Sequence, residues 1–185
     1  MIVFAVVLAF WLGAIPFGML VARKRGVDIR EHGSGNIGAS NVGRVLGARA
    51  GLLVLALDAG KGMLAVAVAQ MYTDDPRLIA GAAFAAIVGH CFSPFLRGRG
   101  GKGVATAFGA FLVLVPKVAF LAVAVFVVVW RIVKVPALGS LAASTAMAAA
   151  LIAAGDRPLA VLASVTTGLL VYTHRANLAK LANRA

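Results

Sequence analysis

The strongest constraint on the fold is a series of apolar runs separated by short polar segments. The runs are Ile2–Ala22, Ala50–Tyr72, Leu78–Leu96, Val104–Val115, Val118–Trp130, Val135–Ala154 and Leu159–Thr173. The 185-residue chain is 62% hydrophobic and its mean hydropathy is +0.97, which is too apolar for an ordinary soluble domain. We therefore expect an all-α polytopic membrane protein with a single domain over residues 1–185.

The distribution of Lys and Arg predicts how the chain crosses the membrane. A helix needs about 20 apolar residues to cross the hydrocarbon core upright, so the short fourth and fifth runs could form one span or two. Seven spans leave only Arg77, Lys117 and Arg157 on one side and put the other loop Lys and Arg residues opposite them, whereas six spans weaken this bias. We predict seven transmembrane helices, with the N-terminus outside, the C-terminus cytoplasmic and the first run an uncleaved span.

Several functional classes are excluded by what the sequence lacks. The net charge of +12 could suggest nucleic acid, but the basic residues lie between apolar runs and no basic helix or aromatic-interleaved motif appears. The single cysteine, Cys91, rules out an intrachain disulfide. No histidine–carboxylate cluster has metal-ligand spacing. We predict no nucleic-acid partner, no metal and no cofactor.

The first polar motif is Gly33–Asn41, followed by Arg44. Gly33–Gly38 matches G-x-G-x-x-G, and Asp58 follows Gly38 by 20 residues, as in a dinucleotide fingerprint. No strand precedes the motif and Asp58 lies within an apolar run, so we exclude NAD. Glycines still let backbone N–H groups approach an anion closely. The alternative is a flexible linker.

The second motif, Arg97–Gly103, has only part of a P-loop. Leu96 stands at the position of the first P-loop glycine and Gly103 replaces its Ser/Thr, which argues against an NTPase. A Gly-Gly-Lys-Gly turn that leads into a helix at Val104 would present N–H groups and the Lys102 ammonium to an anion. The alternative is a basic turn that only sets topology.

Two pairs of polar residues have helical spacing. His174 and Asn177 are three residues apart at the end of the last run, which favours one shared site. Asp58 and Lys61 have the same spacing, so we expect them to share a helix face and neutralise each other. Whether that pair supports the first loop or contacts substrate stays open.

Two single residues allow two roles each. His90, near the end of the third run, can donate to a loop or a substrate, or be a packed hydrogen-bonding residue. Ser140 can cap the sixth helix or donate to a phosphate.

Together, the motifs resemble those of the bacterial acyl-phosphate-dependent glycerol-3-phosphate acyltransferases. The resemblance rests on Gly33–Arg44, on Gly89-His90 with Gly100–Thr106, and on His174–Asn177, and it covers nearly the whole chain in order and spacing. It implies acyl transfer from acyl phosphate to glycerol 3-phosphate, giving lysophosphatidic acid in the first step of phospholipid biosynthesis. It also implies a bacterial cytoplasmic (inner) membrane protein with a cytoplasmic active site, and a functional link to a soluble acyl-phosphate synthase.

The resemblance also implies a set of site residues. The catalytic residues are Ser34, Arg44, Lys102, His174 and Asn177. The resemblance adds Ser140 as a substrate-binding residue. From the motifs themselves we expect substrate binding by Gly33, Gly35, Asn36, Asn41, Gly100, Gly101 and Gly103, and we take Asp58, Lys61 and His90 as candidate supporting residues. The chain departs from the family pattern at Ala137-Leu138, Ala143 and Ala176, where Arg-Tyr, a second serine and a glutamate are common.

Both substrates of such a reaction carry phosphate, and we assign one motif to each. The Gly98–Gly103 turn with Lys102 is expected to hold glycerol 3-phosphate, and Ser34 with Arg44 the acyl phosphate. The general base is either His174 or the phosphate of the donor. The rival function is a transporter of phosphate or an organophosphate, which would need anion-binding groups reachable from both faces.

Overall fold

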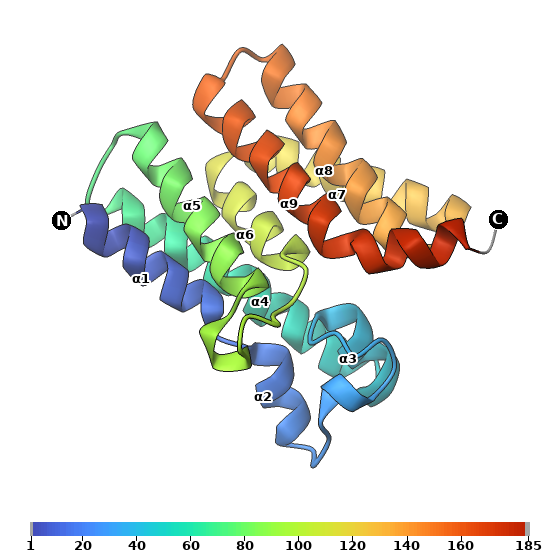
Figure 1. Cartoon of the computed structure of the whole chain (residues 1–185). Coiled ribbons are helices and arrows are strands. Elements are labelled where there is room, and N and C mark those ends of the chain that lie inside the picture. Colours follow the sequence, from blue (N-terminus) through green and yellow to red (C-terminus); the bar gives the residue numbers. More distant parts are fainter. Residues whose placement is uncertain (1, 184–185) are drawn as a thin grey trace.

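The computed structural model describes residues 2–183, and every regular element in this range is a helix (Figure 1). The α-helices are α1 (Ile2–Ala14), α2 (Phe17–Arg23), α3 (Ala39–Leu46), α4 (Ala48–Gln70), α5 (Pro76–Cys91), α6 (Val104–Leu114), α7 (Pro116–Val133), α8 (Pro136–Ala153) and α9 (Arg157–Ala182). Two short 3-10 helices, η1 (Ile29–Glu31) and η2 (Pro94–Leu96), lie in the long loops.

Five segments in residues 2–183 are long and apolar enough to cross a membrane. They are Val3–Arg23, Ala48–Gln70, Pro76–Leu96, Pro116–Val133 and Pro136–Ala153. The prediction of an all-α polytopic membrane protein is confirmed at this level. Because α6 has only 11 residues, it is about 16 Å long. The count of seven spans and the sides of the termini stay predictions.

Prolines and aspartates mark the starts of the later helices. Pro76, Pro116 and Pro136 each stand at the first position of a helix, where their missing N–H costs no hydrogen bond. The Asp75 carboxylate accepts a hydrogen bond from the Arg77 N–H at 2.8 Å and so caps α5. Asp156 caps α9 in the same way through the Leu159 N–H.

Glycines allow two pairs of helices to approach closely. A Cβ at Gly62 would lie 2.1 Å from the Thr106 carbonyl oxygen, and one at Gly109 would lie 1.9 Å from the Ala59 carbonyl oxygen. Only glycine fits these positions, so α4 and α6 pack backbone against backbone. Gly13 and Gly89 do the same for α1 and α5.

The helices form two connected groups. Helix α7 has the most exposed apolar surface of the candidate spans. Helix α1 packs on α4 and α5, and α4 packs on α6, while α8 contacts both α7 and α9 (Figure 1). Helix α9 also contacts α5, and α7 contacts α6, so the two groups are joined at both places. On α7, Phe120, Val128 and Ile132 are exposed. A helix with such an apolar outer face suits contact with lipid.

Candidate active site

The first membrane segment is broken at Ile15-Pro16, between α1 and α2. Proline ends the helical hydrogen-bond ladder because it has no N–H. Two polar side chains from elsewhere satisfy the carbonyl groups at the break. The Ser93 hydroxyl donates to the Ala14 oxygen at 2.6 Å, and the Lys61 ammonium donates to the Ile15 oxygen at 2.8 Å. The break is thus a fixed bend.

A buried polar cluster lies behind this break. Lys61 Nζ is 2.9 Å from Asp58 Oδ1, so the predicted ion pair on one face of α4 is confirmed. His90 Nδ1, from α5, lies 3.6 Å from the same carboxylate oxygen. All three side chains are buried. The three predicted supporting residues therefore form one cluster, which links the helix break to the end of α5.

The predicted glycine turn folds back on the end of α5 and leads into α6 at Val104, as expected. The Gly100 N–H donates to the Cys91 oxygen and the Gly101 N–H to the His90 oxygen, both at 3.0 Å. These two N–H groups therefore have partners inside the protein. A Cβ on Gly101 would lie 2.0 Å from His90 Nε2. Packing against the buried histidine explains this glycine, and direct substrate contact at Gly100 and Gly101 stays a prediction.

Lys102 joins the second motif to the third. Its ammonium donates to Asn177 Oδ1 at 2.6 Å, and its backbone carbonyl accepts from the Thr173 hydroxyl at 3.0 Å. Gly103, just after it, has a φ of +88° and is the N-cap of α6, a conformation that favours glycine. The turn thus holds the lysine against the last helix, although 75 residues separate Lys102 and Asn177.

The charge of Arg44, which follows the first motif, acts on Lys102 of the second motif. Burial lowers the pKa of Lys102 from its ordinary value of 10.5, and the positive charge of Arg44 lowers it further. Burial also lowers the pKa of His174 from 6.5; a hydrogen bond to the Leu170 oxygen opposes this, and the Lys102 charge adds to it. The charge of Arg44 therefore acts on Lys102, and the charge of Lys102 acts on His174.

The ring of His174 is buried and oriented by its own helix. Its Nδ1 lies 2.8 Å from the Leu170 oxygen. A carbonyl can only accept, so Nδ1 carries the proton and Nε2 of the neutral ring holds a lone pair. Because the pKa of His174 is lowered, the ring is neutral near pH 7. It can accept a proton at Nε2.

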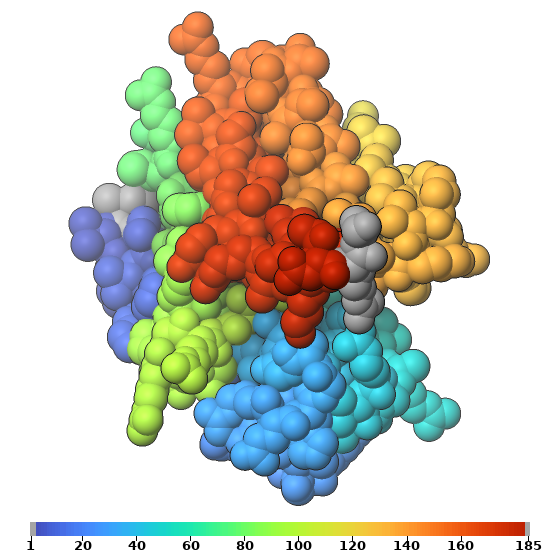
Figure 2. Space-filling view, turned by 45° about the vertical axis from the view of Figure 1, so that its right-hand side comes forward, coloured from blue at the N-terminus to red at the C-terminus, as the bar shows by residue number. Residues whose placement is uncertain are grey.

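Figure 2 shows where these segments meet. The red C-terminal part of α9, the lime loop between α5 and α6, and the light-blue segment before α3 come together on one face. Of the predicted residues, the structure unites Arg44, Lys102, His174 and Asn177. Thr173, which holds the Lys102 carbonyl, is an addition that the sequence reasoning missed; its only signal is a hydroxyl next to His174 at the end of an apolar run.

The first motif is braced from within by Asn41. Its side-chain oxygen accepts from the Ser34 N–H at 2.8 Å, and its amide nitrogen donates to the carbonyl oxygens of His32 at 3.0 Å and Asn36 at 2.9 Å. Asn36 in turn accepts from the Gly38 N–H at 2.8 Å. Asn41 is buried, so its evident role is to shape the loop that carries Ser34. Substrate contact by Asn41 and Asn36 stays a prediction.

Positive backbone angles explain the two leading glycines of this loop. Gly33 has a φ of +62° and Gly35 one of +71°, which other residues rarely adopt. The Gly35 N–H donates to the His32 oxygen. Substrate binding by Gly33 and Gly35 stays a prediction, and so does substrate binding by Gly103.

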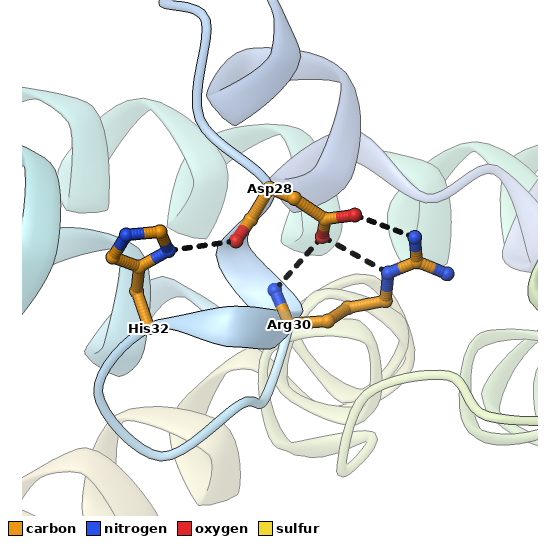
Figure 3. Close-up of polar contacts among 3 residues, drawn as sticks. All are labelled: Asp28, Arg30 and His32. Carbon is orange, nitrogen blue, oxygen red and sulfur yellow. Dashed lines mark hydrogen bonds and ion pairs between the residues drawn. The ribbon is translucent and has the colours of Figure 1, made fainter.

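A second small network fixes the entry to the loop (Figure 3). The Asp28 carboxylate accepts from the Arg30 backbone N–H and from Arg30 Nε, both at 3.0 Å. The hydrogen bonds from Arg30 hold the pKa of Asp28 well below its ordinary 3.8. A ring nitrogen of His32 lies 2.9 Å from the Asp28 backbone oxygen. The direction of the Arg30 guanidinium is therefore set by Asp28.

The prediction that Ser140 caps its helix is wrong. Helix α8 begins at Pro136, and the Ser140 hydroxyl donates to the Pro136 oxygen at 3.0 Å. The hydroxyl is thus one turn inside the helix, bonded to the carbonyl four residues before it. A contact from Ser140 to phosphate stays a prediction.

A family model described as "Glycerol-3-phosphate acyltransferase" matches residues 3–184. A glycerol-3-phosphate acyltransferase of Myxococcus xanthus is 46% identical over 182 residues, which cover 97% of this chain and 95% of the relative. One from a strain of Thermus thermophilus is 43% identical over 181 residues, with coverages of 97% and 90%.

Two solved structures have the same fold. Both are crystal structures of PlsY (YgiH), an integral membrane glycerol 3-phosphate acyltransferase. The glycerol 3-phosphate form has a TM-score of 0.94 at 35% identity and the lysophosphatidic acid form one of 0.92 at 34% identity. Each match covers 98% of this chain and 92% of the other.

Proposed function

The chain belongs to the glycerol-3-phosphate acyltransferase family, and we propose that its acyl donor is an acyl phosphate. It is a multi-pass membrane enzyme that acylates glycerol 3-phosphate to lysophosphatidic acid, and the transporter alternative is not retained. Supporting the donor proposal are the two cations Arg44 and Lys102, which interact with each other and, through Lys102, with the neutral ring of His174. Two phosphorylated substrates bring roughly three to four negative charges, and Arg44 and Lys102 would offset about two of them, with the neutral His174 ring beside them.

Each phosphate is assigned to one side of this site. Lys102, held by Asn177, binds the phosphate of glycerol 3-phosphate together with the Gly98–Gly103 turn. Arg44 and Ser34 bind the phosphate of the donor. Ser34 owes its position to the Asn41 brace, and this supports a loop built to hold its hydroxyl in one place.

His174 is the proposed base. A glycerol 3-phosphate hydroxyl oxygen attacks the carbonyl carbon of the donor, the bond from that carbon to the phosphate oxygen breaks, and phosphate leaves. The hydroxyl proton passes to Nε2 of His174 and from there to the released phosphate. Because phosphate is a good leaving group, positioning and oxyanion stabilisation are needed more than a strong base.

The buried cluster of Asp58, Lys61 and His90 supports the site from behind. Lys61 holds the break between α1 and α2 through the Ile15 oxygen, and the His90 ring and carbonyl lie against Gly101. None of the three is assigned to substrate. They fix the turn that carries Lys102.

The remaining assignments concern the membrane. We propose seven spans in a single domain over 1–185, with the N-terminus outside and the site on the cytoplasmic face of a bacterial inner membrane. Positive loop charge on one side supports this orientation. The short helix α6 would then require a thinned bilayer near the site. A soluble acyl-phosphate synthase is the expected source of the donor.

The donor proposal is tested with purified protein in detergent. Glycerol 3-phosphate is supplied with a synthetic acyl phosphate in one reaction and with acyl-CoA of the same chain length in another. We expect lysophosphatidic acid and inorganic phosphate in equal amounts from acyl phosphate, and no product from acyl-CoA. Product from acyl-CoA alone would overturn the donor assignment and leave the family activity intact.

A further inference from the structure

A second basic pocket lies beside the active site and shares with it only the turn of the second motif, which carries Arg99 as well as Lys102. The cavity has a volume of about 580 Å³ and is lined by Arg23, Arg30, Phe95, Leu96, Arg97 and Arg99. Its walls are the end of α2, the helix η1, the helix η2 and the loop that follows η2. Figure 2 shows the blue and lime segments that contain these residues side by side.

Four arginines line this one cavity. Within residues 2–183, no hydrogen bond or ion pair of the side chains of Arg23, Arg97 or Arg99 is present, whereas Arg30 is held by Asp28. Arginines that only set the topology must lie on one side of the membrane, but they need not line the same cavity. Converging guanidinium groups repel one another and are suited to a shared anion, above all phosphate.

The backbone under Arg97 is fixed in an uncommon conformation. Arg97 has a φ of +53°, rare for a residue other than glycine. Its N–H donates to the Pro94 oxygen at 3.1 Å, and the Gly98 N–H donates to the Ser93 oxygen at 2.9 Å. Ser93 is itself anchored to the Ala14 oxygen in the first span. The pocket edge is therefore a built turn, tied to the helix break.

The pocket opens next to an aromatic surface. The ring of Phe95, a lining residue, lies 5.7 Å from the ring of Trp11 in an edge-to-face contact. Both side chains are exposed, Phe95 by 59% and Trp11 by 46%, and Trp11 belongs to a candidate membrane span. Trp11 is the ninth residue of this 21-residue span, so the aromatic pair faces the hydrocarbon region, where lipid chains lie.

We propose that this pocket binds the phosphate of an anionic phospholipid headgroup, with the lipid chains lying over Trp11 and Phe95. Arg23, Arg97 and Arg99 hold the phosphate oxygens, and Arg30, oriented by Asp28, completes the cationic wall. A free phosphate would satisfy the arginines equally well, but it would leave the exposed aromatic pair without an occupant. The site is independent of which acyl donor the enzyme uses.

The test uses Trp11 as a local probe of bound lipid. The chain has two tryptophans, so Trp130→Phe leaves Trp11 as the single emitter. The protein is placed in phosphatidylcholine nanodiscs with a minor share of phosphatidylglycerol, and bromine is carried by the chains of one lipid or the other. Saturating glycerol 3-phosphate keeps the catalytic site filled. We expect brominated phosphatidylglycerol to quench Trp11 more strongly than brominated phosphatidylcholine at the same mole fraction.

The variant Arg97→Asn/Arg99→Gln should remove this preference, by about fivefold in affinity for each arginine. Asparagine is chosen because it tolerates the backbone angle at 97. The matched control Arg131→Gln/Lys180→Gln removes the same charge elsewhere and should keep the preference. Arg23→Gln serves as a second pocket variant if the first fails to fold.

Three results would overturn the proposal. These are equal quenching by the two lipids in the parent, an unchanged preference in the pocket variants, or a loss as large in the control as in those variants. Inorganic phosphate separates the two sources of the anion. The ³¹P resonance of inorganic phosphate should broaden if the phosphate binds the protein. If this broadening is lost in the Arg97→Asn/Arg99→Gln variant while no lipid preference exists, the pocket binds free phosphate and the lipid assignment is wrong.

Discussion

At the scale of single residues, the site depends on a buried histidine and a half-buried lysine, each of which keeps one reactive group free. His174 donates a hydrogen bond from its Nδ1–H to the Leu170 oxygen, so only Nε2 is left for chemistry. Lys102 gives one hydrogen bond to Asn177 and has two further N–H donors for a phosphate. Burial of both groups strengthens their interaction with a charged substrate.

Replacing His174 with glutamine tests the base directly. Loss of a general base costs about 100- to 10,000-fold in rate, so His174→Gln should lose most of kcat while the affinity for glycerol 3-phosphate changes little. Steady-state kinetics and a binding titration of the same preparation check this. Near-normal turnover would dismiss His174 as the base.

The pKa of His174 predicts the acid limb of the pH profile. Since its pKa is lowered from 6.5, the neutral ring persists down to a pH below that value, and kcat should fall only under pH 6.5. The unfolded chain takes up this proton at a higher pH than the folded one, so stability also declines as the pH falls through this range. A kcat that declines already above pH 7 would contradict the assignment, and the residual activity of His174→Gln should lack this limb.

Pairs three residues apart could be predicted from the sequence, whereas most other contacts could not. Asp58 with Lys61 follows from helical periodicity alone. His90 reaches Asp58 from a different helix, and Thr173 reaches the Lys102 carbonyl across 71 positions. Such contacts depend on how the helices pack. The hydrogen bonds of Asn41 within its own loop could not be predicted, because the first motif is equally suited to binding a substrate.

At the scale of the elements, the main device is a polar turn packed on the end of a helix. The turn that carries Lys102 lies on His90 through Gly100 and Gly101. The start of α6 at Val104 was predicted, because an apolar run follows Gly103 and glycine is an accepted N-cap residue. The break at Pro16 was overlooked because hydropathy alone makes Ile2–Ala22 one continuous run.

Gly101→Ala should disturb this turn. Its Cβ would lie 2.0 Å from Nε2 of the buried His90, and overpacking of this kind costs about 1–3 kcal/mol. We expect a lower melting temperature and reduced turnover as Lys102 shifts. Gly60→Ala is the matched control, because a Cβ there meets nothing within 4 Å and alanine favours a helix. Equal melting temperatures and equal turnover for both variants would refute the packing role.

At the scale of the whole molecule, the membrane orientation decides which compartment supplies the substrates. The apolar helices and the family are established, whereas the sides of the membrane rest on charge. Asp74 lies in the loop between α4 and α5, and Lys180 near the end of α9. These two positions are predicted to face opposite compartments.

Single cysteines test this orientation in a Cys91→Ala background. A membrane-impermeant maleimide should label Asp74→Cys in intact cells and Lys180→Cys only after the membrane is opened. Labelling of Lys180→Cys in intact cells, with Asp74→Cys protected, would reverse the topology and move the site to the outer face.

The most direct test of a single active site built from three motifs is a double-mutant cycle between Arg44→Gln and Lys102→Gln. The free energies are taken from kcat/KM for glycerol 3-phosphate at saturating donor. Residues that share one site couple by more than about 0.5 kcal/mol, and we predict coupling above that level. Lys102→Gln combined with Lys180→Gln should be additive. Additivity of Arg44→Gln with Lys102→Gln would mean that the two cations serve separate sites and would contradict the single-site arrangement.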